Sequence, residues 1–277
     1  MKIEQDLHVH TYLSNCGEES ATIPYYRQLA HDHGLKTIGI TDHMWDAEIP
    51  FTEHMIKHRH SLWYQPQNLS HVLEIRKDFL PDPDVKFLSG AEVEYCPGRG
   101  PAITIEAARR LDFIIVPISH TSITMPDEHY DPPRDCIDFM VNAFMEVCRC
   151  ELALYITAIA HPFEPLCPRE MRKPIMSKIA AEQYRMCFYA ARDAGIAMEI
   201  NTDSFDVDTA DAIASDEVIR MLRIARDCGT KFTFGSDAHA AGEHDKFFIR
   251  APIIADLLDL KESDIAAPRL CSNIHER

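Results

Sequence analysis

Short apolar segments alternate with segments of helical periodicity along almost the whole chain, and this alternation limits its fold more than any other feature. Seven apolar segments are typical of strands, at residues 3–9, 36–41, 85–92, 112–118, 153–160, 196–200 and 231–236. Helical periodicity occupies residues 24–33, 67–79, 103–110, 134–150, 173–194 and 216–228. Gly34, Gly195 and Gly229 follow helical runs, where helices commonly end. The alternation favours a parallel sheet, and seven strands without a break in composition predict one closed or nearly closed α/β barrel, a single domain over residues 1–277.

The first apolar segment carries His8 and His10, two residues apart. In a strand both imidazoles face one side, with Val9 facing the other. Two neutral imidazoles from one strand form half of a transition-metal site. The alternative is a hydrogen-bonded histidine pair inside the barrel. Asp237 and His239, again two apart at the end of the last apolar segment, could complete the metal site.

A residue type that can bind metal stands at the end of every predicted strand. In α/β barrels the functional face is built from these C-terminal strand ends and the loops that follow them. Such residues are therefore expected to meet at one end of the barrel. They are His8 and His10, Asp42 and His43, Glu92, His120, His161, Glu199 and Asn201, and Asp237 and His239.

Six histidines, one Glu and one Asp of this set exceed the four ligands of one tetrahedral zinc. They fit two or three divalent ions (zinc, manganese or iron) that share a bridging carboxylate. Such ions activate water at neutral pH and neutralise phosphoryl oxygens. The sequence contains no G-x-S-x-G elbow, Walker loop or Rossmann glycine fingerprint. A metal-bound water is therefore the expected nucleophile.

The order of these motifs resembles the PHP (polymerase and histidinol phosphatase) family of metal-dependent phosphoesterases. The resemblance covers residues 6–240 and implies a distorted (β/α)7 TIM-like barrel, in agreement with the seven predicted strands. The motifs are His8-x-His10, Thr41-Asp42-His43, Gly90-x-Glu92, Ser119-His120, His161-Pro162 and Gly235-Ser236-Asp237-x-His239.

The resemblance also implies a role for each residue. The first metal would be held by His8, His10, Glu92 and Asp237. Glu92 would bridge to a second metal, held by His120 and His161. A third would be held by His43 and His239. Asp42 would be an outer-shell or proton-handling carboxylate, which places Asp42, Glu92 and Asp237 in the catalytic set. Asn201 would line the substrate pocket.

The loop after the first strand departs from the family pattern. Many members carry an Asp or His ligand there, whereas this chain reads Ser14-Asn15-Cys16-Gly17. Cys16 either joins His43 and His239 around the third metal, as a thiolate suited to zinc, or is a small buried thiol packed under the loop.

Three long loops, at residues 44–66, 121–133 and 162–172, are expected to build the pocket over the strand ends. Arg99, Arg169 and Arg172 lie in or near such loops and are candidates to bind phosphate. His54 and His58 could share a helical face and bind a metal. A solvated or lid-packing pair is favoured, because no third ligand has a fixed spacing to them.

Net charge and cysteine spacing limit the classes of binding partner and the cellular compartment that are expected for this chain. The formal net charge of −16 disfavours nucleic acid, whose phosphates it repels. No run of 18 apolar residues and no signal peptide is present, and no C-x-x-C pair occurs among nine cysteines. A cytoplasmic protein with reduced thiols and no membrane contact is expected; the oligomeric state stays open.

The predicted function is hydrolysis of a small phosphorylated metabolite, as a phosphomonoesterase, by attack of metal-bound hydroxide. Two alternatives remain. An amidohydrolase also opens with H-x-H in a barrel, but it uses a Lys or carboxylate bridge and usually a lone Asp after the last strand. A metal-stabilised module without catalysis is the other.

Overall fold

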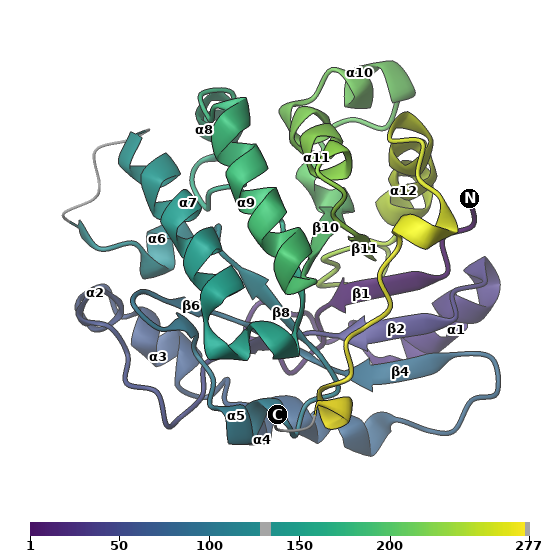
Figure 1. Cartoon of the computed structure of the whole chain (residues 1–277). Helices are drawn as coiled ribbons and strands as arrows, with labels where there is room; N and C mark the ends of the chain where they lie inside the picture. Colours follow the sequence, from purple (N-terminus) through teal and green to yellow (C-terminus); the bar gives the residue numbers. More distant parts are fainter. Residues whose placement is uncertain (128–133, 275–277) are drawn as a thin grey trace.

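The computed structural model describes residues 1–127 and 134–274, so part of the predicted 121–133 loop lies outside the described residues. Nine parallel strand segments form its centre (Figure 1). They are β1 (Gln5–Val9), β2 (Thr37–Ile40), β3 (His43–Met44), β4 (Lys86–Ser89), β5 (Ala91–Val93), β8 (Ile114–Pro117), β9 (Ile156–Ala160), β10 (Ala197–Asn201) and β11 (Phe232–Gly235). A short antiparallel hairpin of β6 (Tyr95–Cys96) and β7 (Gly100–Pro101) lies apart from them.

The nine segments form the seven strands of a barrel, because two of these strands are each interrupted once. β2 continues into β3, and β4 continues into β5 after Gly90. The pairing shows this, because β2 pairs with β4 and β3 pairs with β5. From β5 the order runs through β8, β9 and β10 to β11. The predicted count of seven strands is therefore confirmed.

Backbone hydrogen bonds between the ends of the first and last strands, β1 and β11, close the barrel. Asp237 N donates to His8 O at 2.8 Å, and His10 N donates to Ala238 O at 2.9 Å. The closing bonds involve three residues that the sequence predicts as metal ligands. The barrel seam and the start of the candidate site are therefore the same piece of backbone.

Helices cover the outside of the barrel (Figure 1). They are α1 (Ile23–His33), α2 (Glu53–Lys57), α3 (His60–Tyr64), α4 (Leu69–Val72), α5 (Ile105–Ala108), α6 (Thr121–Thr124), α7 (Arg134–Arg149), α8 (Arg169–Met176), α9 (Ala181–Ala194), α10 (Ala210–Ala214), α11 (Glu217–Asp227) and α12 (Asp245–Leu257). Local chemistry sets their ends. Thr22 caps α1 by accepting a hydrogen bond from Tyr25 N, and Gly34 ends it with a φ of 73°.

Several predicted boundaries were wrong. The strand predicted over 153–160 begins only at Ile156, because residues Glu151–Tyr155 form a 3-10 helix. The helix predicted over 173–194 is two helices, α8 and α9. Ala180 N donates to the Gln183 side chain at 3.0 Å, which caps a new helix start. α12 was not predicted, since Pro252 interrupts its pattern.

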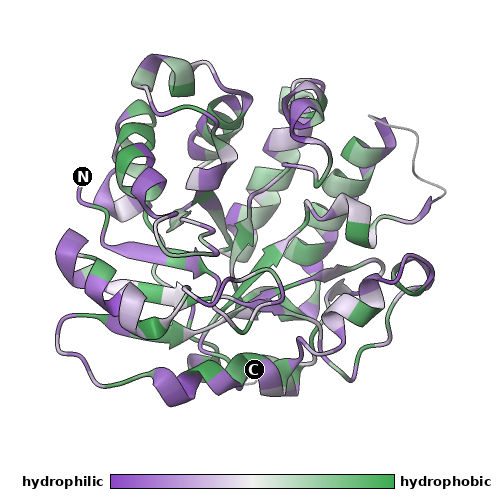
Figure 2. Cartoon of the chain, turned by 180° about the vertical axis from the view of Figure 1, so that it is seen from behind, coloured by the Kyte–Doolittle hydropathy of each residue, from purple (hydrophilic) through white to green (hydrophobic). Residues whose placement is uncertain are grey.

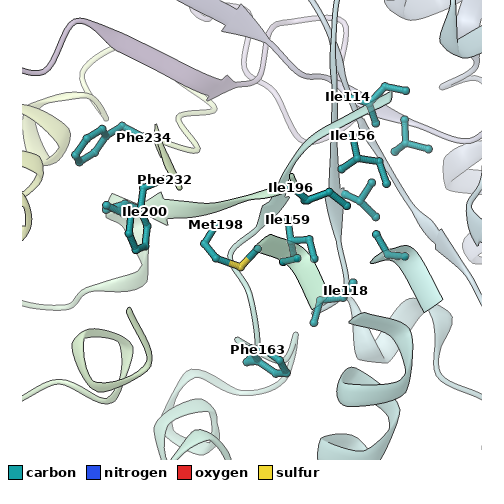
Figure 3. Close-up of a cluster of buried hydrophobic side chains, with 14 of the residues drawn as sticks. Ile114, Ile118, Ile156, Ile159, Phe163, Ile196, Met198, Ile200, Phe232 and Phe234 are labelled. Carbon is teal, nitrogen blue, oxygen red and sulfur yellow. The ribbon is translucent and has the colours of Figure 1, made fainter. Parts of the chain in front are cut away.

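Apolar side chains fill the space between the barrel and its helices, and Figure 3 shows part of this layer on β8–β11. β1 is an exception to the apolar rule for buried strands. Its residues are mostly buried, yet Figure 2 colours it largely purple, because it carries Gln5, Asp6 and His8. The hydrophobic effect alone therefore does not account for the burial of this strand, whose polar side chains include a predicted metal ligand.

Inside the barrel, a second apolar cluster forms a floor. It contains Leu7, Leu88, Phe113, Ile115, Ala158, Ala160 and Ala197. Phe113 fills the centre because Gly39 and Gly90 leave room for its ring: a Cβ on Gly39 would lie 2.4 Å from it. The C-terminal segment, yellow in Figure 1, covers this end from outside, where Ala266 N donates to Phe232 O and Cys271 N donates to Asp112 O. The barrel is thus closed at the end opposite the ligand-bearing strand ends.

Candidate metal centre

Four predicted ligands surround one point at the C-terminal end of the barrel. His8 Nε2 lies 3.1 Å from His10 Nε2. Asp237 Oδ1 lies 3.3 Å and 3.2 Å from these two nitrogens, and Glu92 Oε2 lies 3.5 Å and 3.6 Å from them. In a tetrahedral zinc site with bonds of 2.0–2.1 Å, ligand atoms are about 3.3–3.4 Å apart. The spacing therefore fits an ion of this kind.

Hydrogen bonding alone does not explain this arrangement. His8 Nδ1 donates to the carboxylate of Glu199 at 2.7 Å, which leaves a lone pair on Nε2. In this neutral form the lone pair faces other acceptors, so either a proton on Nε2 or a metal ion must lie among them. Burial lowers the pKa of His8, but Glu199, Asp237 and Glu92 outweigh it and raise this pKa well above the ordinary value. The surroundings favour positive charge at this point.

The second carboxylate oxygen of Glu92 faces another pair of imidazoles. His161 Nε2 lies 2.9 Å from Glu92 Oε1, and His120 Nε2 lies 3.9 Å from it. In both rings the remaining nitrogen is occupied: Ser119 Oγ contacts His161 Nδ1 at 2.5 Å, and Glu94 accepts from His120 Nδ1 at 2.9 Å. With one oxygen toward each group, Glu92 has the position of a bridging carboxylate.

Glu94 is a site residue that the sequence analysis missed. It is fully buried, and it also accepts a hydrogen bond from Tyr64 Oη at 2.6 Å. Burial raises the pKa of its carboxyl, but His120 and His43 lower it to about 2, so the group is anionic. The sequence signal that could have identified it is its spacing of two residues from Glu92, directly after the end of β5.

His43, His239 and Cys16 form a third group beside His10. One ligand atom from each of these four residues lies within 4.8 Å of the others. His239 Nδ1 donates to Asp237 O at 2.7 Å, so its Nε2 is the nitrogen left to face Cys16 or a metal ion. Burial raises the pKa of the Cys16 thiol, but hydrogen bonds with His239 and His43 lower it to about 6. The structure thus brings Cys16 to the two imidazoles named for it; its role as a ligand stays a prediction.

The backbone is strained where two of these residues leave their strands. His161 has a φ of 28° and Asp237 a φ of 56°, a region that non-glycine residues rarely adopt. His161 N donates to Glu199 Oε2 at 2.6 Å, which helps to hold this conformation. Gly235 leaves the space for it: a Cβ there would lie 2.0 Å from Glu199 Oε1 and 2.6 Å from the His8 Cβ.

Asp42 and Asn201 act on neighbouring groups. Both oxygens of Asp42 accept hydrogen bonds from Thr11, from its backbone N at 2.6 Å and its hydroxyl at 2.7 Å. This fixes the first turn of the loop that carries Cys16. Asn201 donates to Asp237 Oδ2 at 3.0 Å and so orients the carboxylate whose other oxygen faces His8 and His10.

A pocket opens beside the centre. Its lining consists of His120, His161, Glu164, Leu166, Arg172, Asn201, Asp203, Ser204 and Asp237. Among the described residues, the buried Nε of Arg172 has no hydrogen-bond partner. Of the other candidate arginines, Arg169 pairs with Asp206, and Arg99 is exposed in the turn between β6 and β7. Arg172 is the one of the three that lines this pocket.

Comparisons with known proteins agree with this geometry. A family model described as the PHP domain matches residues 6–203, and the family predicted from the strand-end motifs is thereby confirmed. The chain is 26% identical over 251 residues to a protein of Thermoanaerobacter pseudethanolicus named "Probable phosphatase", covering 89% of this chain and 83% of that one. It is 26% identical over 256 residues to a "Probable phosphatase" of Acetivibrio thermocellus, covering 89% and 84%.

The fold is also similar to that of a solved structure. Histidinol phosphate phosphatase from Lactococcus lactis, complexed with zinc, L-histidinol and phosphate, matches with a TM-score of 0.54 and 16% identity, over 92% of this chain and 93% of that chain. The predicted TIM-like fold class is confirmed by this likeness. In the part of the chain that the structure describes, no helix has the length and hydropathy of a membrane span.

Proposed function

Because the chain belongs to the PHP domain family, we propose that it is a metal-dependent phosphoesterase that hydrolyses a small phosphorylated metabolite. The observation that carries this proposal is the position of Glu92, with one oxygen toward His8 and His10 and the other toward His161. When bound, divalent ions at these residues supply a lowered pKa for water and charge stabilisation for a phosphoryl group.

The donor set supports a specific distribution of metals. His8, His10, Glu92 and Asp237 would hold the first ion. Glu92, His120 and His161 would hold the second. We call these residues, together with His43 and His239, the barrel cluster. Zinc suits a centre made largely of imidazoles, and the zinc found in the L. lactis enzyme supports this choice.

A third ion would be held by His43, His239 and Cys16. A thiolate is a good zinc ligand and a poor one for manganese, so the involvement of Cys16 and the identity of the metal are linked. The alternative is a two-metal centre in which Cys16 is a polar thiol that hydrogen-bonds Ser14, whose Oγ lies 3.2 Å from its sulfur. Anomalous scattering at the zinc edge decides between them: a sulfur more than about 4 Å from every metal rejects the ligand role.

The pocket supplies the substrate contacts. Arg172 lines this pocket together with Asn201 and Asp237, and its Nε has no hydrogen-bond partner among the described residues, which supports a role in binding a phosphate oxygen. Arg169 is less suited because Asp206 neutralises it. The L. lactis enzyme was crystallised with L-histidinol and phosphate, which supports a phosphomonoester of comparable size. The nine free cysteines support the predicted cytoplasmic location.

The test is a phosphate-release screen over a panel of phosphorylated metabolites, with metal content measured on the same sample. Chelation should abolish turnover, and zinc or manganese should restore it. Full turnover by metal-free protein overturns the proposal. Amide and nucleobase substrates in the same panel test the amidohydrolase alternative. Bound metal without turnover of any substrate would favour the non-catalytic module.

A further inference from the structure

We propose that the chain holds a second, separate site for a divalent transition metal, built from His54, His58 and Asp127, which we call the lid cluster. His54 lies in α2, and His58 ends that helix. Asp127 lies just beyond α6, which the loop carrying α2 packs against. None of the three belongs to the barrel cluster or lines the pocket beside it.

The three side chains converge on one point. Asp127 Oδ1 lies 3.0 Å from His54 Nδ1 and 2.8 Å from His58 Nε2. The two histidines are one helical turn apart, with ring centroids 4.5 Å from each other. One ligand atom from each residue lies within 4.8 Å of the other two. Two imidazoles and one carboxylate, with water as the fourth ligand, form a zinc-type site.

The tautomer of His54 shows why the point needs a cation. Its Nε2 lies 3.3 Å from Ser122 O, a carbonyl oxygen that can only accept, so Nε2 carries the hydrogen. In the neutral ring, Nδ1 then presents a lone pair to the Asp127 carboxylate. This nitrogen is buried and has no hydrogen-bond partner among the described residues. A proton or a metal ion must lie between the two groups.

The surroundings favour a metal over a proton. A histidine that donates its second nitrogen to a backbone carbonyl has the arrangement usual for metal-bound imidazoles. The other oxygen of Asp127 pairs with Lys57, which orients the carboxylate as an outer hydrogen bond does around a metal ligand. His54 and Asp127 also line a surface pocket with Glu53, which gives an ion and its water access to the site.

Elsewhere the chain shows what a simple histidine–carboxylate pair looks like. His31 Nε2 lies 2.9 Å from Asp82 Oδ2, and among the described residues Arg27 is the only other side-chain cation that pairs with that oxygen. One imidazole meets one carboxylate there, and a single shared proton explains it. The lid cluster has two imidazoles on one oxygen, which a metal satisfies at once. The two histidines with similar exposure, His31 and His58, therefore make a matched pair for testing.

The experiment measures zinc bound to the full chain by three variants in parallel. After equilibration with zinc and removal of loosely bound metal, His58→Ala should hold about one equivalent less than the wild type, whereas His31→Ala should hold the wild-type number. Asp127→Asn serves as a second variant that keeps the volume. Anomalous scattering at the zinc edge should show a peak between His54 and Asp127.

The outcome is independent of the proposed phosphoesterase. Glu92→Gln should lose metal from the barrel cluster and retain the anomalous peak at the lid cluster, and His58→Ala should retain phosphate release. Equal zinc content in wild type, His58→Ala and Asp127→Asn, with no peak at Asp127, overturns the proposal and assigns the contact to a protonated imidazole.

Discussion

Two clusters of imidazoles and carboxylates occupy the same molecule in very different settings. The barrel cluster draws its ligands from residues 8 to 239, and the His8 side chain is 1% exposed. The lid cluster takes two ligands from one helical turn and a third from a neighbouring loop, and the His58 side chain is 41% exposed. The donor atoms are similar, so differences in affinity and exchange should come from the scaffold around them.

The scaffolds differ most in how the outer nitrogens are held. In the barrel cluster, Glu199, Glu94 and Ser119 fix the rings of His8, His120 and His161. All three lie on strands or directly after them, inside a low-dielectric interior that strengthens charge interactions. In the lid cluster, Ser122 O holds the ring of His54, and the exposed Lys57 holds the carboxylate of Asp127. A tightly held centre and a readily exchanging one are therefore expected in one chain.

The largest effect is expected from Glu92→Gln. This change keeps the side-chain volume and removes the negative charge that the first and second metal positions of the barrel cluster would share. The expected loss in kcat/KM is about a thousandfold or more, since metal stabilisation of the transition state amounts to several kcal/mol. At least one metal equivalent should be lost as well. Phosphate release and metal content on one sample measure both. An unchanged stoichiometry and rate would remove Glu92 from the bridging role.

A second test removes an anchor and leaves every ligand in place. Glu199 accepts hydrogen bonds from both His8 Nδ1 and His161 N, and an amide cannot accept from both with its two terminal atoms. Glu199→Gln should weaken metal binding about 10- to 100-fold, the usual cost of losing an outer partner. Competition with a chelator measures this affinity. The comparison of the two scaffolds fails if the affinity matches that of the wild type.

Substitutions of Arg172 and Arg99 should differ in their effect on the KM for substrate. A hydrogen bond to a charged group contributes about 1.5–3 kcal/mol, so Arg172→Ala should raise KM about 10- to 100-fold with a smaller change in metal content. Arg99→Ala is the matched control, because Arg99 is exposed in a hairpin turn, and it should leave KM within about twofold of the wild type. Equal effects of the two substitutions would contradict the role of Arg172.

The smallest effect concerns stability. Zinc at about 100 times its Kd stabilises a folded protein by about 2.7 kcal/mol, which corresponds to a Tm change of about 5–10 °C at this size. Complete chelation should lower Tm by at least that amount. His58→Ala in excess zinc should lower Tm by no more than about 3 °C, since it removes only the exposed site. Scanning calorimetry with and without chelator measures both shifts; a larger loss from His58→Ala would reverse the comparison.

The strand-end ligands could be predicted because period and position suffice for them. Parallel strands place their C-terminal ends together whatever the intervening helices do, so His8 and Asp237 could be joined across most of the chain. Asp127 could not be assigned to His58, 69 residues away, because the contact depends on how two irregular loops pack. Arg169 and Arg172 are one helical turn apart, and only the packing of α8 decides which one faces the pocket.

Phe113 and the C-terminal segment close the barrel beneath the candidate metal centre, so under the proposed function substrate, water and both products would share one opening. In that reaction the alcohol product would lie nearer the opening, whereas the freed phosphate would stay deeper in the pocket that Arg172 and Asp237 line. Phosphate must then leave along the path by which the next substrate arrives. Inorganic phosphate should therefore inhibit competitively, and under saturating substrate we expect phosphate release to limit the turnover rate.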